Sequence, residues 1–263
     1  MVTQLLAWWT GCTVMAPFVV DEDNDGVRAP FDCDDTVPNF GLGLEIPYDG
    51  IDNDCDRRTP DDDLDGDGLT RADDCDDQDG AGLAHGTLDK LDVRQNAAPC
   101  GGYCDLVVEG GVVYDDQGSR DLSSMHCLVE VGSWLYVVGE PLLESLEGLE
   151  RLTHVGHSLV LVDLPALESL SGLSQLDAVE GGLWLENADV LTDLASLPPL
   201  AMPLLRLQGN EILETVGEPG QLLINRSLSI SNNPLLGSLV GLAVTSTLDL
   251  GLTIESNPRL VDL

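Results

Sequence analysis

The residues best suited to chemistry are aspartates that recur at fixed spacing near the start of the chain. In the first loop Asp21, Asp23, Asp25 and Asp32 take positions 1, 3, 5 and 12, and a glycine takes position 6. The backbone carbonyl of Val27 would supply position 7. Oxygen ligands at these five offsets, with glycine allowing a sharp turn, are the pattern of a Ca²⁺-binding loop.

A second loop repeats these offsets further along the chain. Asp63, Asp65, Asp67 and Asp74 take positions 1, 3, 5 and 12, and the Leu69 carbonyl takes position 7. A frame that starts two residues earlier also places Asp at three odd positions and stays open. We prefer the first frame because the first Asp of each loop then lies 12 residues before a Cys.

These ligand types indicate Ca²⁺ as the cofactor, with one ion in each loop. Zn²⁺ and copper favour imidazole and thiolate ligands, and the stretch from 21 to 80 contains no His. Position 12 is Asp, where helix-flanked calcium loops carry the longer Glu, so we expect weak affinity, about 10⁻⁴–10⁻³ M. The alternative is an acidic, solvated segment that binds no specific ion.

Composition and motifs narrow the range of functions. The chain has 263 residues and a formal net charge of −36. This charge repels phosphate, so it argues against nucleic acid and anionic membrane surfaces as partners. The sequence contains no G-x-S-x-G, no phosphate-binding glycine loop and no H-E-x-x-H. We therefore expect a protein that is not an enzyme.

Residues 1–20 are typical of an export signal. Their short apolar core precedes Trp9-Thr-Gly11-Cys12, which resembles the cleavage box of bacterial lipoproteins, although no Lys or Arg precedes the core. In this interpretation Cys12 is lipidated and the protein is anchored at the outer membrane through that lipid alone. The alternative is cleavage after Ala16, which gives a secreted protein.

The six cysteines that follow Cys12 indicate disulfides, because an even number in an exported chain favours pairing. Fifteen pairings are open to six cysteines. Assignment by proximity along the sequence predicts Cys33–Cys55, Cys75–Cys100 and Cys104–Cys127.

The Asp-rich segment, residues 21–80, resembles known metal-binding repeats. Its loops lack flanking amphipathic helices and are similar to thrombospondin type 3 and dockerin calcium loops. The D-C-D-D that ends each loop, and D-G-I-D-N-D-C-D at 49–56, resemble most closely the MopE-type metal-binding motif of exported bacterial proteins. Tyr48 and Arg57 depart from that motif. The family name is associated with copper, whereas the ligands here favour Ca²⁺.

From Val131 to Leu263 the chain is an internal repeat built on a leucine column. Successive anchor leucines lie 24, 24, 22, 23 and 24 residues apart. Apolar residues also recur four residues before each anchor, and two, eight and eleven residues after it. The anchors are Leu135, Leu159, Leu183, Leu205, Leu228 and Leu252. The column four residues earlier contains Val131, Val155, Val179, Ala201, Ile224 and Leu248.

This repeat predicts a mainly β fold, a right-handed parallel β-solenoid preceded by a small loop-rich calcium-binding module. The alternation of anchor and anchor+2 is a strand pattern. A unit of 22–24 residues cannot bury its own apolar face, so it must stack on its neighbours. We place a linker at 81–103 and the solenoid at 104–263, incomplete at its C-terminal end. Cys104 to Val108 would form a first, capping strand.

The repeat resembles two structurally close families. Asn210, Asn233 and Asn257 fill the Asn column of a leucine-rich repeat, and the V-x-x-x-L-x-L strand is similar to receptor L domains. The second resemblance implies a ligand-binding lobe. Gly148, Gly172 and Gly241 mark a recurrent turn.

The neighbours of inward strand residues point outward. This rule places Trp134, Tyr136, Val160 and Trp184 on one outer surface, whereas later outward positions are small or polar. We predict a ligand surface at these four residues. The alternative is that residues 81–130 fold over the rings and bury them.

The favoured function is an exported or surface-anchored recognition module that binds a protein or glycan at the cell surface. The alternative is a structural or adhesive envelope spacer without a specific small ligand.

Overall fold

The computed structural model describes residues 21–24, 26, 27, 32, 34, 36, 38, 55, 61, 63, 69–71, 73–75, 82–94, 99–115, 118–244 and 248–261. The chain divides into two compact units. The first comprises residues 1–72 and 76–82, and the second comprises residues 73–75 and 83–263.

Turns, bends and irregular segments make up the described residues of the first unit. Asn24 and Gly26 have positive φ angles of 65° and 100°, and Gly26 is the glycine at position 6 of the first Asp loop. The side chain of Asp34 accepts hydrogen bonds from the backbone N–H and the hydroxyl of Thr36, at 3.2 and 2.6 Å. Such local bonds favour turns over strands, so the described residues of this unit are consistent with the loop-rich module that the sequence predicts.

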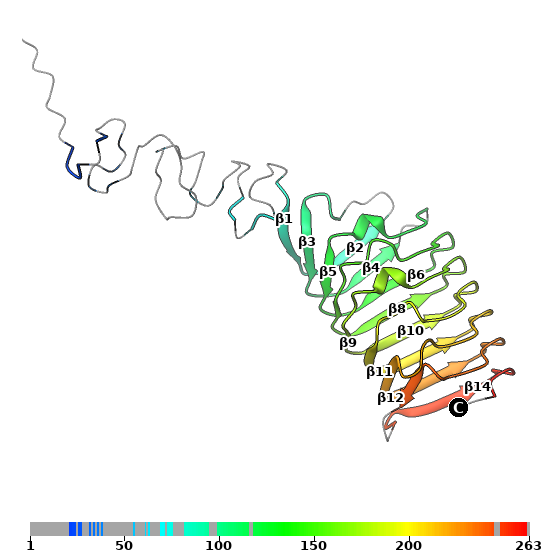
Figure 1. Ribbon diagram of the computed structural model, residues 1–263. Helices are drawn as coiled ribbons and strands as arrows, with labels where there is room; N and C mark the ends of the chain where they lie inside the picture. The colour runs from blue at the N-terminus through cyan, green and yellow to red at the C-terminus, as the bar shows by residue number, and fades with distance from the viewer. Residues whose placement is uncertain are drawn as a thin grey trace, which may run out of the picture. The chain divides into compact units, whose positions relative to one another are not determined.

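The second unit is a parallel β-solenoid, as predicted, and its strands form two sheets (Figure 1). Within the described residues, all pairs between named strands are parallel. The five-stranded sheet has the order β1 (Ala84–Leu88), β3 (Tyr103–Val108), β5 (Leu128–Val131), β7 (His154–Val155) and β9 (Ala178–Val179).

The nine-stranded sheet forms a second wall. Its order runs from β13 to β2, and β14 pairs with β12 beside β13. Its strands are β2 (Leu91–Arg94), β4 (Val112–Asp115), β6 (Leu135–Val138), β8 (Ser158–Val162), β10 (Gly182–Glu186), β11 (Leu200–Gln208), β12 (Leu222–Ser231), β13 (Leu242–Val244) and β14 (Gly251–Glu255). Two short 3₁₀ turns, η1 (Ser123–Met125) and η2 (Ser171–Leu173), lie in the connections. No described helix is long and apolar enough to cross a membrane.

The anchor column sets the register of the nine-stranded sheet. Each predicted anchor pairs with the next, from Leu135 with Leu159 through to Leu228 with Leu252. The anchors from Leu135 to Leu228 are buried in one continuous hydrophobic core. Burial of one leucine side chain contributes about 1.5–3 kcal/mol, so slipping a strand by one residue would expose a whole row of them.

The solenoid begins earlier than the predicted residue 104. Strands β1 and β2 lie within 81–103, the segment expected to be a linker. Leu91 pairs with Val112, and Val112 pairs with Leu135, which extends the anchor column by two strands. These first strands are missed because the column changes from leucine to valine and glycine-rich turns surround it.

A short antiparallel segment covers the free edge of β1. Asp74 forms an isolated bridge with Ala84. The Cys75 N–H donates to the Leu83 carbonyl at 3.1 Å, and the His85 N–H donates to the Asp73 carbonyl at 2.9 Å. Covering an edge in this way satisfies backbone groups that would otherwise pair with another chain. Residues 73–75 therefore act as the cap of the five-stranded sheet.

One predicted inward residue points the other way. Ala201 is exposed, and its neighbour Met202 is buried instead. The prediction for Ala201 is wrong because β11 runs through the corner as one nine-residue strand, with a register shift between Met202 and Leu204. The shortest repeat spacing, 22 residues, falls at this position.

The glycine column predicted as a recurrent turn packs directly against the preceding rung. A Cβ added at Gly148 would collide with the carbonyl oxygen of Leu122, and one at Gly172 with that of Leu146. Gly241 is crowded in the same way by Val216. These positions need glycine because the backbones of adjacent rungs approach too closely for a side chain.

The asparagine column forms a buried ladder of amides. Asn210 donates from Nδ2 to Asn233 Oδ1 at 3.0 Å, and Asn233 donates from Nδ2 to Asn257 Oδ1 at 3.1 Å. The same oxygens accept the backbone N–H groups of Asn210 and Asn233, at 3.1 and 3.0 Å. Each amide thus satisfies backbone groups at a buried turn, as the leucine-rich-repeat pattern implies.

Candidate functional site

One outward column of the nine-stranded sheet carries large side chains on consecutive strands. Tyr136 on β6 pairs with Val160 on β8, and Val160 pairs with Trp184 on β10. Trp184 pairs in turn with Arg206 on β11. Neighbouring parallel strands are about 4.8 Å apart, so Tyr136 and Trp184 are separated by about 10 Å. Trp134, which directly precedes β6, joins this group. We call Trp134, Tyr136, Val160, Trp184 and Arg206 the aromatic face.

The two tryptophans of the aromatic face are open to solvent. Trp134 is 42% exposed and Trp184 is 37% exposed. The rings of Trp134 and Tyr136 are 5.9 Å apart between centroids and tilted by 55°, a favourable arrangement for an aromatic pair. The predicted alternative, in which residues 81–130 bury the rings, therefore does not hold for the tryptophans.

Val160 differs from its neighbours in exposure. It stands in the outward column, as predicted, but only 6% of it is exposed. A short side chain in register between Tyr136 and Trp184 has little area left open. Val160 therefore fills the space between the two rings with apolar atoms and offers little surface of its own to a ligand.

Arg206 adds a cation at one end of the aromatic face. Its guanidinium carbon lies 5.6 Å from the centroid of the Trp184 ring, within the range of a cation–π contact. Its Nε is 2.6 Å from Glu186 Oε1, and its Nη2 donates to Gln208 Oε1 at 2.6 Å. These partners hold the guanidinium beside the ring and keep its position fixed on the sheet.

The first Asp loop is only partly described. Asp25 lies outside the described residues, whereas Asp21, Asp23, Val27 and Asp32 lie within them. Asp32 is 6% exposed, and its Oδ1 accepts the Asp34 N–H at 3.0 Å. Its Oδ2 and the Oδ1 of Asp21 are buried without a hydrogen-bond partner among the described residues. A buried carboxylate oxygen without a donor is costly, and a bound cation would remove that cost.

The second Asp loop is divided between the units. Asp63 and Leu69 belong to the first unit, and Asp74 belongs to the second. Asp63 and Asp74 are buried. Asp65 and Asp67 lie outside the described residues, so the ligand set predicted for this loop stays a prediction.

The predicted pairing of four cysteines is wrong. The disulfides are Cys75–Cys104 and Cys100–Cys127, with sequence separations of 29 and 27 residues. The rejected pairs, Cys75–Cys100 and Cys104–Cys127, have similar separations, so proximity along the chain cannot distinguish the correct pairs from the incorrect ones. The fold decides, because Cys100 and Cys127 both sit in the core just before a strand. For the third predicted pair, Cys55 is disulfide-bonded and Cys33 lies outside the described residues.

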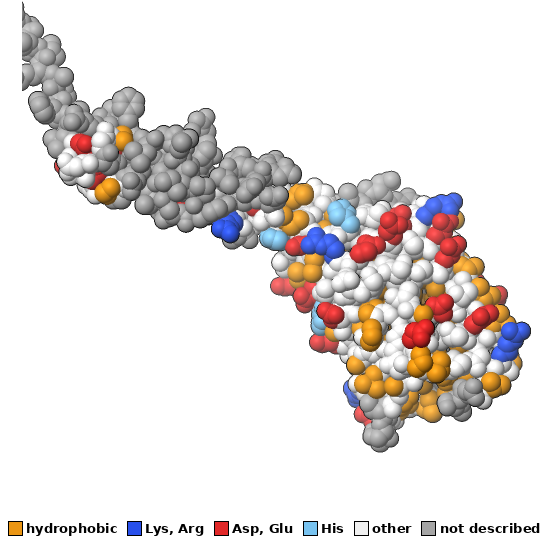
Figure 2. Space-filling model, in the orientation of Figure 1, with side chains coloured by type: hydrophobic (Ala, Val, Ile, Leu, Met, Phe, Trp, Pro, Cys, Tyr) orange, Lys and Arg blue, Asp and Glu red, His pale blue; other side chains and the backbone are white. Residues whose placement is uncertain are grey.

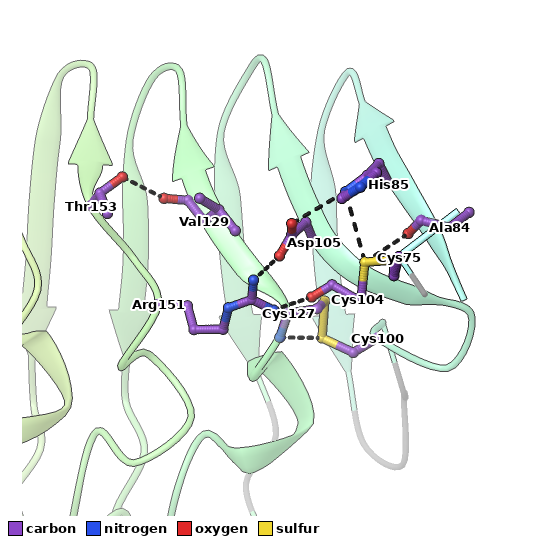
Figure 3. Close-up of polar contacts among 10 residues, drawn as sticks. All are labelled: Cys75, Ala84, His85, Cys100, Cys104, Asp105, Cys127, Val129, Arg151 and Thr153. Carbon is purple, nitrogen blue, oxygen red and sulfur yellow. Dashed lines mark hydrogen bonds and ion pairs between the residues drawn. A yellow bond between two sulfur atoms is a disulfide. The ribbon is translucent and has the colours of Figure 1, made fainter. Parts of the chain in front are cut away.

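A polar group surrounds the Cys75–Cys104 disulfide at the first strands of the solenoid (Figure 3). His85 Nδ1 lies 3.7 Å from Cys104 Sγ and 3.2 Å from Asp105 Oδ2. Arg151 pairs with Asp105 Oδ1 and donates to the backbone carbonyl of Cys104. The side chain of His85 is half exposed.

The strand register explains this grouping. His85 on β1 pairs directly with Asp105 on β3, and directly opposed residues of a sheet lie side by side. The ligand atoms of Cys75, His85 and Cys104 all lie within 4.8 Å of one another. Sequence reasoning missed this Cys/His group because it placed His85 in a linker and assigned the two cysteines to different disulfides.

A second exposed apolar region occurs at the end of the solenoid formed by β12–β14 (Figure 2). Leu252, the last anchor, is 61% exposed, and Val244 and Leu250 are also exposed. A cavity of about 260 Å³ opens there. It is lined by Leu228, Leu239, Leu242, Val244, Leu248, Leu252 and Ile254. In the described residues, the core columns are thus left open at this end.

Comparison with protein-family models, curated proteins and solved structures finds no match to this chain.

Proposed function

We propose that the protein is a non-enzymatic recognition module whose aromatic face binds a protein or glycan at a cell surface. The observation that carries this proposal is the exposure of Trp134 and Trp184 on one face of the nine-stranded sheet. Clustered, exposed aromatic side chains are enriched at contact surfaces and supply much of the binding energy there.

The chemistry of the aromatic face suits a ligand with one apolar surface. Tyr136, Val160 and Trp184 form a continuous apolar strip across three paired strands. A sugar ring or an apolar protein side chain would stack on the rings. Arg206, held beside Trp184, would donate hydrogen bonds to a carboxylate or hydroxyl group at the edge of that ligand.

The test uses the full chain and substitutions Trp134→Ala and Trp184→Ala. Binding would be measured on a panel of immobilised oligosaccharides and on a panel of purified cell-surface proteins. We expect each substitution to weaken binding to the recognised probe by at least about thirtyfold, since hot-spot truncations cost about 2 kcal/mol or more. Leu142→Ala is the matched control, because Leu142 is an exposed apolar residue away from the aromatic face.

Two results would favour the spacer alternative. One is that neither panel contains a probe that binds. The other is a probe whose affinity is the same for the wild type and for the double variant of Trp134 and Trp184. Circular dichroism of every variant would establish that the solenoid is intact.

The proposal includes Ca²⁺ binding by the first Asp loop. Its support is the buried Asp32 side chain, whose Oδ2 has no hydrogen-bond donor in the described part of the chain. The left-handed backbone of Gly26 also supports it, since φ is 100° at loop position 6, where calcium loops need a sharp turn. Bound Ca²⁺ would offset the repulsion between carboxylates and stabilise the loop.

Calorimetric titration of the full chain with Ca²⁺ tests the loop. We expect binding with Kd of about 10⁻⁴–10⁻³ M, and a marked loss of affinity in Asp32→Asn. Asp34→Asn is the control. Asp34 lies two residues after Asp32, is exposed and is not one of the proposed ligands, so this variant removes the same charge without removing a ligand. Equal affinities for these two variants would contradict the assigned ligand role of Asp32.

Export completes the proposal, with either a lipid at Cys12 or release of the mature chain. Both features concern residues 1–20, which lie outside the described residues. Mass spectrometry of the mature N-terminus distinguishes them: lipidation gives a diacylglyceryl cysteine at position 12, whereas cleavage after Ala16 leaves Pro17 first. An unprocessed Met1 would contradict both.

A further inference from the structure

We propose that reduction of the Cys75–Cys104 disulfide creates a binding site for a thiophilic divalent cation such as Zn²⁺. The ligands would be the two cysteine thiolates and the imidazole of His85. This inference is independent of the proposed recognition function. It rests on the spacing of the three ligand atoms, on their accessibility and on contacts that hold them when the disulfide is open.

The spacing of the ligand atoms fits a tetrahedral zinc site. Zn–S and Zn–N bonds of about 2.3 and 2.1 Å give S···N edges of about 3.6 Å and an S···S edge of about 3.8 Å. His85 Nδ1 already lies 3.7 Å from Cys104 Sγ, and all three ligand atoms lie within 4.8 Å of one another. Once the S–S bond is broken, the sulfur atoms need to move apart by less than about 2 Å to accept the ion.

A fourth donor lies beside the histidine. Asp105 Oδ2 is 3.2 Å from His85 Nδ1, close to the N···O edge of about 3.4 Å that a tetrahedral zinc site requires. Arg151 contacts the other oxygen of this carboxylate, which orients Oδ2 toward the histidine (Figure 3). Two thiolates, one imidazole and one carboxylate are all ligand types that Zn²⁺ accepts.

The two described disulfides differ in accessibility. Cys75 and Cys104 are both partly exposed, whereas Cys100 and Cys127 are buried in the core. A reductant must reach a sulfur atom to attack it, so of these two bonds Cys75–Cys104 is the one that opens first in the folded chain. Cys100–Cys127 stays closed and preserves the first rungs of the solenoid.

Contacts other than the disulfide hold the three ligands in place. The Cys75 N–H donates to the Leu83 carbonyl, and the His85 N–H donates to the Asp73 carbonyl. Arg151 binds the Cys104 carbonyl. These bonds involve backbone groups and remain when the sulfurs are reduced. The metal would therefore join the same edge segment to β3 that the disulfide joins in the oxidised chain.

The reduction of the Cys75–Cys104 disulfide requires an external dithiol as the reductant. The dithiol supplies two electrons and two protons, so its own S–S bond forms while the Cys75–Cys104 bond breaks into two thiols. Zn²⁺ then displaces one proton from each thiol to solvent, because only thiolates ligate the metal.

The experiment compares the full chain before and after mild native reduction with dithiothreitol, followed by anaerobic removal of the reductant. Thiol counting should show two more free thiols than in the oxidised chain, and circular dichroism should be unchanged. Zn²⁺ is then titrated by calorimetry, and Co²⁺ is added as a spectroscopic probe of thiolate ligation. We expect one additional Zn²⁺ site in the reduced chain and a sulfur-to-cobalt charge-transfer band that the oxidised chain lacks.

Variants identify the ligands. His85→Ala should lower the affinity of the reduced chain for Zn²⁺ by more than about tenfold, since loss of an outer partner alone costs that much. His157→Ala is the matched control, because His157 lies at the corner between β7 and β8. Reduced Cys75→Ser/Cys104→Ser should lose the additional site and the cobalt band. Equal Zn²⁺ binding before and after reduction, an unchanged His85→Ala, or unfolding on native reduction would each overturn the proposal.

Discussion

Removal of the central amide of the asparagine ladder is the sharpest test of how the solenoid is held together. Asn233 is fully buried and forms five hydrogen bonds through its side chain to neighbouring rungs and to its own turn. In Asn233→Ala the N–H of Asn210 loses the acceptor that it has at 3.1 Å. A buried N–H without an acceptor costs about 1–3 kcal/mol.

The remaining bonds contribute less, because some of their partners keep a second contact. The Ser231 carbonyl still accepts the Gly209 N–H at 3.1 Å, and Asn257 Oδ1 still accepts the Asn233 backbone N–H at 3.0 Å. Each lost bond of this kind is worth about 0.5–1.5 kcal/mol net. We therefore expect Asn233→Ala to lower the free energy of unfolding by about 4 kcal/mol.

The assay is urea denaturation followed by circular dichroism, with all disulfides intact. Thr192→Ala is the control, since Thr192 is exposed and its hydroxyl donates a hydrogen bond to the Asp193 carboxylate at 3.2 Å. That variant should lose less than about 1 kcal/mol, as is usual for surface positions. Similar losses in the two variants, or a loss below about 1 kcal/mol for Asn233→Ala, would refute the ladder as a main source of stability.

Three further predictions concern packing and the aromatic face. Gly172→Ala should destabilise the solenoid by about 2 kcal/mol or more, because its Cβ would overlap the preceding backbone, whereas Gly118→Ala, which has open space, should be neutral in the same urea assay. Replacing Cys100 and Cys127 by Ala should cost about 3–4 kcal/mol, the loop entropy of a 27-residue separation; a thermal melt that does not shift would contradict this. Trp184→Ala should change the free energy of unfolding by less than about 1 kcal/mol, and a larger loss by urea denaturation would assign the ring to folding rather than to binding.

The repeat made the register of the solenoid predictable. A row of leucines at nearly constant spacing has only one parallel alignment that buries every member, so the pairing of Leu135 with Leu159 and onward follows from burial alone. The same reasoning failed at Ala201, where the repeat shortens and one long strand replaces two short ones. The repeat predicts whether a residue points inward or outward only where successive rungs turn in the same way between strands.

The disulfide pairing and the Cys/His group could not be predicted from the sequence, and the reason is the same for both. Both depend on which residues are opposed across strands that the sequence did not reveal. Once β1 is placed beside β3, His85 is opposite Asp105 and the sulfur atoms of Cys75 and Cys104 meet. The separations of the correct and rejected pairs are too similar for chain length to decide between them.

The inward and outward columns of the solenoid differ in how far the requirements of folding explain their residues. Inward leucines, turn glycines and stacked asparagines are all explained by burial, close approach or hydrogen bonding. These requirements account for less of the outward column, where the small or polar Ser229 and Thr253 occupy the later strands. They do not explain why large aromatic side chains stand at Tyr136 and Trp184. Exposed apolar area that folding does not explain is the physical reason why we propose recognition at the aromatic face.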